Sequence, residues 1–430
     1  MKNPSSLSTS NFGDIVEAVF HGKIINGTFI KYDGKLVLIK LKSGYDVALL
    51  VKELSSFKII KKETAKTDKT LDSRYAKEDH PDIALINTGG TISSKIDYKT
   101  GGVSPSVPPE YYFKIAPGLK DFGKIEINPL MSVLSENMKP LDWIKIAKAA
   151  YSSIKKGAKG VIVTMGTDTM HYAAAALSFL LNPLSVPIVF TGAQRSTDRG
   201  STDASTNLLL SAITASKWEG GESIICMHAT TNDDYNFILR GNCARKMHSE
   251  RRDAFRPINF KPLGKVFLDG RIERVSVPMK RAEETVPNLY IDQKVRLLMS
   301  YPGMDGRQIE DAVKEGIHGI VLAGTGFGNI PLGDASIRKA LSNADAENVP
   351  IAITSQTIYG PTNKFVYSTM RELSMRKNIL YLGNMTTETA LVKLMFVLGK
   401  TKKMEEIRKL MVTPLAGESS ERNEIDEFLI

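Results

Sequence analysis

Apolar and polar positions along this 430-residue chain change their period twice. In residues 1–62, short β-rich runs such as 36–39 are separated by Asp33-Gly34 and Ser43-Gly44, which are both hairpin signals. Short strands at this spacing predict a small antiparallel β-barrel of about five strands. The next stretch, 63–80, is highly charged and poor in apolar residues, which is typical of a linker.

After Pro81 the pattern becomes an alternation of strands and helices. Short apolar runs predict strands buried on both faces of a sheet at 83–86, 160–164, 187–191 and 223–227. Amphipathic stretches predict helices at 141–150 and 172–181. Repeated units of this kind predict a parallel sheet with helices on both faces.

The alternation is lost over 271–292, which we interpret as a connector between two domains. The larger α/β domain is then 81–270 and the smaller one 293–415, followed by a polar tail at 416–430. In the smaller domain we expect strands at 296–299, 319–322 and 351–354, and helices at 308–315 and 387–398. The predicted fold class is therefore α/β, with an N-terminal barrel followed by a two-domain parallel-sheet unit.

Composition narrows the functional classes. Hydrophobic residues make up 42% of the chain, no apolar run approaches the length of a membrane span, and the N-terminus lacks an apolar signal core. Two cysteines and six scattered histidines fit a cytoplasmic protein that has neither a disulfide framework nor a metal site. The net charge of +10 is spread along the chain, so it favours an RNA partner only weakly.

The first predicted strand of the larger domain ends in Thr88-Gly89-Gly90-Thr91. The two glycines allow a sharp turn and a close approach of a ligand to the main chain, at the sheet edge where α/β proteins bind ligands. Taken alone, this is a glycine-rich turn that could also hold a nucleotide. We rank that interpretation lower because the GxGxxG and GxxxxGK[ST] spacings are absent.

The second strand ends in Thr164-Met165-Gly166-Thr167-Asp168-Thr169, about 75 residues later. Asp168 beside Thr167 fits a helix cap when read alone. Strands of successive βα units bring their ends together, however, so both threonine clusters are expected to face one crevice. Lys246 could accept a proton from a threonine if burial and a nearby Arg245 or Arg240 lower its pKa, and on spacing alone it is equally a solvated lysine.

These two motifs together resemble the paired signatures of the type I L-asparaginase family. The resemblance runs from about residue 82 to 400. It includes three further segments: Thr191-Gly192-Ala193-Gln194-Arg195, Asp203-Ala204-Ser205-Thr206-Asn207-Leu208, and Ala323-Gly324-Thr325-Gly326-Phe327-Gly328-Asn329. It implies an amidohydrolase that cleaves a side-chain amide in two steps through a threonine ester.

The resemblance also implies a role for individual residues. Thr91 matches the family's nucleophile, with Thr167 as the alternative carrier of the ester, and Tyr98, in the loop at 93–110, matches the tyrosine that activates Thr91. Thr167, Asp168 and Lys246 match the second catalytic group, which positions the water. Backbone amides of the Gly89-Gly90 turn and of the Thr167 region would stabilise the oxyanion. The substrate-binding residues implied are Ser135, Glu136, Gly90 and Thr88, with Glu136 standing where the family usually has glutamine.

The N-terminal barrel is similar to the one added in a branch of this family, the D subunits of archaeal glutamyl-tRNA(Gln) amidotransferases. The branch implies glutamine hydrolysis, with ammonia passed to an E subunit that binds Glu-tRNA(Gln) and uses ATP and Mg, so no cofactor is expected on this chain. The family implies a homodimer, here within a larger heteromer. The alternatives are a free-standing asparaginase or glutaminase, and a non-enzymatic RNA adaptor built on the barrel.

Overall fold

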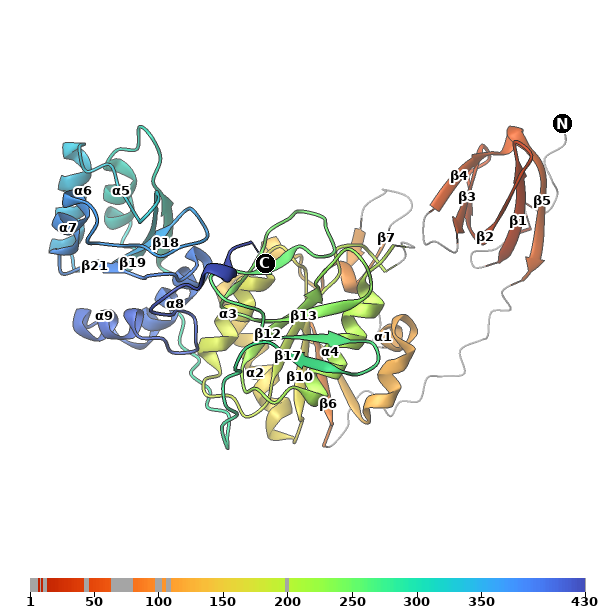
Figure 1. Cartoon of the computed structure of the whole chain (residues 1–430), viewed down its shortest axis with the longest axis horizontal. Helices are drawn as coiled ribbons and strands as arrows, with labels where there is room; N and C mark the ends of the chain where they lie inside the picture. The colour runs from red at the N-terminus through yellow and green to blue at the C-terminus, as the bar shows by residue number, and fades with distance from the viewer. Residues whose placement is uncertain are drawn as a thin grey trace.

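The computed structural model describes residues 7, 9–10, 14–41, 46–62, 80–96, 103–105, 110–197 and 201–429. Figure 1 shows three parts in chain order: an N-terminal sheet in red, a larger α/β domain from orange to green, and a smaller domain from teal to blue. This is the α/β class with an antiparallel N-terminal sheet that the sequence predicts.

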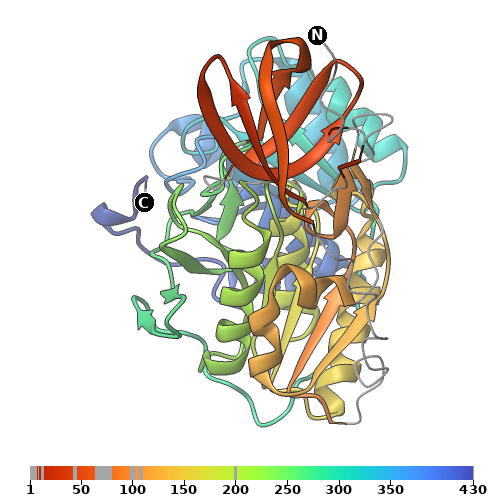
Figure 2. The same ribbon diagram turned by 90° about the vertical axis from the view of Figure 1, so that its right-hand side faces the viewer.

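The N-terminal part is a curled antiparallel sheet of five strands, paired in the order β4-β3-β2-β1-β5 (Figure 2). The strands are β1 (Ile15–Phe20), β2 (Lys23–Tyr32), β3 (Leu36–Leu41), β4 (Asp46–Leu50) and β5 (Leu54–Lys61), with the 3-10 turn η1 (Val51–Glu53) before the last. The predicted Asp33-Gly34 hairpin is present, since Gly34 has φ +93° and the Asp33 carboxylate accepts from the Leu36 amide. Alternate residues such as Val16, Ala18 and Phe57 fill its core.

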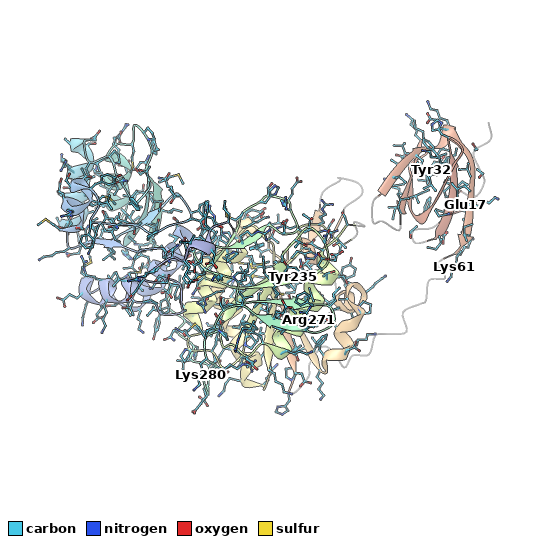
Figure 3. All side chains as sticks on the ribbon, in the orientation of Figure 1. Glu17, Tyr32, Lys61, Tyr235, Arg271 and Lys280 are labelled. Atoms are coloured by element: carbon cyan, nitrogen blue, oxygen red, sulfur yellow. The ribbon has the colours of Figure 1, made fainter. Side chains whose placement is uncertain are left out.

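The larger domain holds an eight-stranded sheet in the order β17-β16-β13-β12-β11-β10-β6-β9. Five strands are parallel: β9 (Ile125–Pro129), β6 (Ile83–Asn87), β10 (Gly160–Thr164), β11 (Ile188–Thr191) and β12 (Ser223–His228). The other three are antiparallel: β13 (Tyr235–Arg240), β16 (Gly264–Phe267) and β17 (Ile272–Arg274). Figure 3 places Tyr235 and Arg271 at this antiparallel end. The sheet is thus mixed, and its last strand lies in the stretch that the sequence assigns to the connector at 271–292.

Helices cover both faces of this sheet because its buried strands are apolar on both sides. Along β6, Ala84 and Ile86 pack with one core and Ile83 and Leu85 with the other. The first core includes α2 (Pro140–Lys155) and α3 (Met170–Leu180), and the second includes α1 (Glu110–Ile115), η4 (Pro117–Phe122) and α4 (Ala204–Lys217).

Several short elements complete the larger domain. Two of its strand pairs lie outside the main sheet: β7 (Ser94–Ile96) with β8 (Val103–Pro105), and β14 (Ala244–Lys246) with β15 (Phe255–Pro257). Two 3-10 turns, η3 (Thr91–Ser93) and η5 (Ser135–Asn137), follow strands of the main sheet.

The smaller domain is a four-stranded parallel sheet in the order β18-β19-β20-β21. Its strands are β18 (Val295–Met299), β19 (Gly319–Gly324), β20 (Ile351–Ser355) and β21 (Ile379–Tyr381). Its helices are α5 (Arg307–Lys314), α6 (Ala335–Ala346), α7 (Ser368–Ser374), α8 (Thr387–Lys400) and α9 (Met404–Val412), and the chain ends with η6 (Ile425–Glu427). Helices α5 and α6 pack on one face of the sheet and α8 on the other.

Helix α8 also joins the two α/β domains. It lies beside α3 of the larger domain (Figure 1), and the rings of Phe179 and Phe396 stack with their centroids 5.8 Å apart. One continuous apolar core therefore runs from the larger sheet through α3 and α8 to the smaller sheet. The segment that the sequence assigns to a polar tail, 416–430, begins inside this junction, where Ala416 and Glu418 are buried.

Candidate active site

The ends of β6 and β10 lie side by side at the centre of the larger sheet. Their parallel register pairs Thr164 with Asn87, so the two threonine motifs begin at the same edge. The backbone amide and the hydroxyl of Thr88 both donate to the Thr164 carbonyl, at 2.9 and 3.0 Å. Thr88 is fully buried, so its side chain ties one strand end to the other.

The Gly89-Gly90 turn needs glycine at both positions. Gly89 has φ +107° and Gly90 has φ +83°, in the region that L side chains rarely adopt. A Cβ on Gly90 would lie 2.1 Å from the backbone nitrogen of Gly166. The turn therefore lies directly against the second motif, and there is room only for hydrogen between them.

We expect Gly90→Ala to destabilise the fold and to abolish most activity. Positive φ alone costs roughly 1–3 kcal/mol, and the new methyl group would also push Gly166 and the following Thr167 away from the turn. Thermal unfolding and ammonia release measure the two effects. Gly303→Ala is a matched control, because Gly303 has φ +86° and nothing within 4 Å of the added Cβ. Equal loss of stability in both variants would contradict the role given to the contact.

Three of the predicted catalytic residues meet above this turn. The Lys246 ammonium donates to the Thr167 hydroxyl at 2.9 Å and to the Asp168 carboxylate at 2.6 Å. The Lys246 side chain is 9% exposed and that of Asp168 is 65% exposed. Lys246 comes from the short strand β14, and the other two follow β10. The structure thus brings together residues that are 78 and 79 positions apart in the sequence.

A cavity of about 270 Å³ adjoins this cluster. Its lining includes Gly90, Ser135, Glu136, Thr167, Asp168 and Lys246, together with Leu134, Gly166, Gln194 and Ser249. Ser135 is buried, and its carbonyl accepts from the Thr169 hydroxyl at 2.7 Å, which fastens the Ser135-Glu136 segment to the second motif. Three of the four predicted substrate-binding residues therefore line the cavity, whereas Thr88 lies buried beneath it.

The backbone of Thr91 follows Gly90 directly and begins η3, whose Ser93 amide donates to the Gly90 carbonyl at 3.0 Å. Thr91 is thus placed next to the cavity by its main chain. Its side chain lies outside the described part of the structure, and so does all of Tyr98.

Comparison with known proteins gives this arrangement a family. A sequence profile described as "Asparaginase, N-terminal" matches residues 82–279, and one described as "Glutaminase/Asparaginase C-terminal domain" matches 294–411. Together they cover well over half of the chain. The chain belongs to the asparaginase family.

Relatives that match along nearly the whole chain show which branch of the family it resembles. The chain is similar to the D subunit of the glutamyl-tRNA(Gln) amidotransferase of Pyrococcus horikoshii, with 37% identity over 97% of each chain. It is 40% identical to the D subunit of the corresponding enzyme of Methanobrevibacter smithii, over 95% of this chain and 93% of that one. The expected resemblance, including its branch, is confirmed.

Solved asparaginases share the fold of the α/β part. The thermostable L-asparaginase from Thermococcus kodakarensis is 27% identical, with a TM-score of 0.72, and covers 79% of this chain and 99% of its own. L-asparaginase I from Vibrio cholerae is 26% identical, with a TM-score of 0.68, and has the same coverage of both chains. The family profiles begin at residue 82, so the N-terminal sheet is an addition to this asparaginase-like unit.

Two residues of this asparaginase-like site were not among the predicted site residues. The Asn87 side chain accepts from the Gly89 amide at 3.0 Å and from the Thr164 hydroxyl at 3.2 Å, so it shapes the turn from within β6. Gln194 lies in the cavity wall, 3.4 Å from the Thr167 hydroxyl. It follows β11, the strand beside β10, so the strand-end rule could have indicated it.

Buried Asp203 holds the Gln194 segment in place. Its carboxylate accepts from the backbone amides of Gln194 and Arg195 at 3.1 Å and from the Asn207 side chain at 3.0 Å. Burial raises the pKa of Asp203. The two segments that resemble the family around residues 194 and 203 therefore form one hydrogen-bonded unit behind the cavity.

His171, one turn after Asp168, is a buried histidine beside two cations. Burial, followed by the charges of Arg245 and Lys246, lowers the pKa of His171 to about 3. It is therefore neutral throughout the physiological range. A histidine whose folded pKa is depressed destabilises the fold when the pH drops below its unfolded pKa of about 6.5.

We expect the unfolding free energy to fall as the pH drops from about 6.5 towards 4, with His171 contributing up to about 1.4 kcal/mol per pH unit. The His171→Phe variant should lack this part of the pH dependence, since it has no proton to bind. Chemical denaturation at several pH values measures both slopes. Parallel slopes for the two proteins would contradict the assignment to His171.

No group of three or more histidine, cysteine, aspartate or glutamate side chains within the described residues could hold a metal ion. In the same part of the chain, no helix is both long and apolar enough to cross a bilayer.

Proposed function

We propose that this chain is the glutamine-hydrolysing subunit of a glutamyl-tRNA(Gln) amidotransferase. The observation that carries the proposal is its 37–40% identity to D subunits over 95–97% of the chain, N-terminal sheet included. The cluster of Thr167, Asp168 and Lys246 beside the Gly90 turn supplies the chemistry that such a subunit needs.

The reaction we propose is a two-step amide hydrolysis. The Thr91 hydroxyl attacks the side-chain carbonyl of glutamine while Tyr98 takes its proton. Tyr98 passes this proton to the amide nitrogen, the C–N bond breaks, and ammonia leaves a glutamyl ester on Thr91. A water then attacks the ester carbon, its released proton reaches the Thr91 oxygen as the ester C–O bond breaks, and glutamate leaves. In this proposal the water is positioned by Thr167, Asp168 and Lys246, because the Lys246 ammonium donates to the Thr167 hydroxyl at 2.9 Å and to the Asp168 carboxylate at 2.6 Å and so fixes both groups beside the cavity.

The sequence assigns the oxyanion site to backbone amides of the Gly89-Gly90 turn and of the Thr167 region. Within the turn, the Gly89 amide donates to the Asn87 side chain at 3.0 Å. We therefore place the oxyanion site at the parts of this assignment that border the cavity, Gly90 and the Thr167 segment, where the developing negative charge would be stabilised.

We propose that the other cavity wall binds the α-carboxylate and α-amino groups of the substrate. Ser135 and Glu136 line the cavity together with the Lys246 cluster, so Glu136 offers a carboxylate for the α-ammonium group of an amino acid. We propose that the chain works in the cytoplasm as a homodimer joined to an E subunit. That partner would bind Glu-tRNA(Gln), and ATP and Mg would act there, where the ammonia is consumed.

Ammonia release tests the proposal. The chain is co-expressed with its E subunit and given glutamine, ATP, Mg and Glu-tRNA(Gln), and both ammonia and Gln-tRNA(Gln) are measured. We expect rapid glutamine hydrolysis only with the partner and the charged tRNA. The alternative, a free-standing asparaginase or glutaminase, predicts full hydrolysis of asparagine or glutamine by the isolated chain. Formation of Gln-tRNA(Gln) by a partner supplied only with ammonia, but never with this chain and glutamine, would overturn the proposal.

A further inference from the structure

Lys246 lies on β14, a strand that belongs to none of the three larger sheets. Among the described strands, β14 pairs with β15 alone, where Lys246 lies opposite Phe255, and the Met247 amide donates to the Ala254 carbonyl at 2.7 Å. This contact fixes one side of the strand from within the larger domain. The loop at 241–243 that leads into β14 is held partly by the larger domain, where the Gly241 amide donates to the Ser223 carbonyl at 2.9 Å and the Ile258 amide to the Cys243 carbonyl at 2.8 Å. The smaller domain supplies further contacts to the same segment.

The first turn of α8 contacts this loop at Asn242 and the strand β14 at Arg245. The Thr389 hydroxyl donates to the Asn242 carbonyl at 2.8 Å, and the Glu388 carboxylate pairs with the Arg245 guanidinium at 3.0 Å. Thr389 and Glu388 are 2% and 7% exposed. The two contacts fall four residues and one residue before Lys246, so they limit how that side chain can shift or rotate.

The turn after α9 contacts the same loop at Asn242 and Cys243. The Asn242 side chain donates to the Ala416 carbonyl at 2.9 Å, and the Cys243 thiol donates to the Gly417 carbonyl at 3.3 Å. This turn is itself closed by Glu418, whose carboxylate accepts from the Leu415 and Ala416 amides. Asn242 is thus held through its carbonyl by α8 and through its side chain by the C-terminal segment.

We propose that the first turn of α8 positions the catalytic lysine, and that Thr389 is a positioning residue for Lys246. The inference rests on the proposed role of Lys246 in glutamine hydrolysis. Thr389 touches neither the cavity nor the reacting atoms, so it acts through the Asn242 main chain. The smaller domain thereby sets the geometry of a residue that the larger domain contributes.

The physical reason lies in the short distances around the ammonium group. The Lys246 ammonium donates to Thr167 at 2.9 Å and to Asp168 at 2.6 Å. Both distances depend on the position of the Lys246 Cα, which is set by β14. A displacement of about 1 Å in a catalytic group can cost on the order of 10²-fold in rate. Loss of one of the several contacts that hold this segment should cost less, about 10-fold in kcat.

Three threonine variants separate positioning from a general loss of structure. Thr389→Val keeps the shape of the side chain and removes the hydroxyl, whereas Thr389→Ser keeps the hydroxyl. Thr387→Val is the matched control, since Thr387 lies in the same helical turn and its hydroxyl bonds to Thr354 at 2.9 Å within the smaller domain. All are assayed as the complex with the E subunit, with glutamine, ATP, Mg and Glu-tRNA(Gln), by ammonia release and by thermal unfolding.

We expect Thr389→Val to lower kcat about 10-fold with KM changed less than about 2-fold, and Thr389→Ser to restore kcat to within about 2-fold of the original. Thr387→Val should keep the original kcat. The inference is overturned by an unchanged kcat in Thr389→Val, by equal losses in Thr389→Val and Thr389→Ser, or by an equal loss in Thr387→Val. If Thr389→Val does not fold, Glu388→Ala tests the second contact by the same split between kcat and KM. An original complex that releases no ammonia from glutamine would instead refute the proposed function.

Discussion

Thr91→Ala should lower ammonia release from glutamine by at least about 10³-fold, because the variant has no hydroxyl to form the glutamyl ester. Thr91 follows Gly90, a residue of the cavity wall, directly in the chain, so its main chain lies next to the cavity. The measurement is kcat for glutamine in the complex with the E subunit. Glutamine binding, measured by calorimetry, should persist in Thr91→Ala, because the proposed binding residues Ser135 and Glu136 are unchanged.

The conservative variant makes this prediction specific. Thr91→Ser keeps a hydroxyl and should retain activity well above that of Thr91→Ala. A trapped glutamyl ester, detected by mass spectrometry on a peptide containing residue 91, would support the assignment directly. Near-original activity in Thr91→Ala, or an ester located on Thr167 instead, would show that the nucleophile has been assigned to the wrong threonine.

The second large effect concerns stability. Lys393, in α8, and Glu418 form an ion pair whose two side chains are both fully buried, with Nζ and Oε1 2.5 Å apart. The ammonium also donates to the carbonyls of Met411 and Thr413, at 3.0 and 2.8 Å. Removal of one partner from a buried pair leaves an uncompensated charge and typically costs about 3–5 kcal/mol.

We therefore expect Glu418→Leu to lower the free energy of unfolding by about 3–5 kcal/mol. Lys393→Met should cost a similar amount, because each remaining charge keeps two backbone partners: the Glu418 carboxylate accepts from two amides, and the Lys393 ammonium donates to two carbonyls. The double variant, which has no buried charge left, should be more stable than the sum of the single losses predicts. Denaturant unfolding of the four proteins completes the cycle, and strict additivity would contradict a direct interaction between the two charges.

Much of the fold follows from the apolar pattern, and the exceptions have physical causes. The run at 160–164 coincides with β10, and the helix expected at 387–398 lies within α8. Helix α4 was not predicted because its buried face carries polar residues such as Ser211 and Thr214. These residues interrupt the apolar pattern that would otherwise show a helical period. Thr214 satisfies its hydroxyl at the Leu210 carbonyl, one turn back. Strands β16 and β17 are too short, and too mixed in polarity, to stand out.

The site divides in the same way. The convergence of Thr88 and Thr167 could be predicted because parallel neighbours end at one edge of a sheet. The role of Lys246 needed a family resemblance, since nothing local distinguishes it from other lysines. The contact between Thr389 and Asn242 joins residues 147 positions apart, so only the folded chain reveals it.

The shared core of α3 and α8 has a consequence for how the molecule loses its structure. One apolar cluster includes residues of both α/β domains, so unfolding of either domain would expose buried apolar surface of the other. The two domains should therefore unfold as a single cooperative unit. The N-terminal sheet has a cluster of its own, built from residues such as Val16, Phe29 and Phe57. Scanning calorimetry should therefore resolve two transitions, one for the N-terminal sheet and one for the two α/β domains together. The boundary between the two cooperative units lies before residue 80, and no separate transition is expected for the smaller α/β domain.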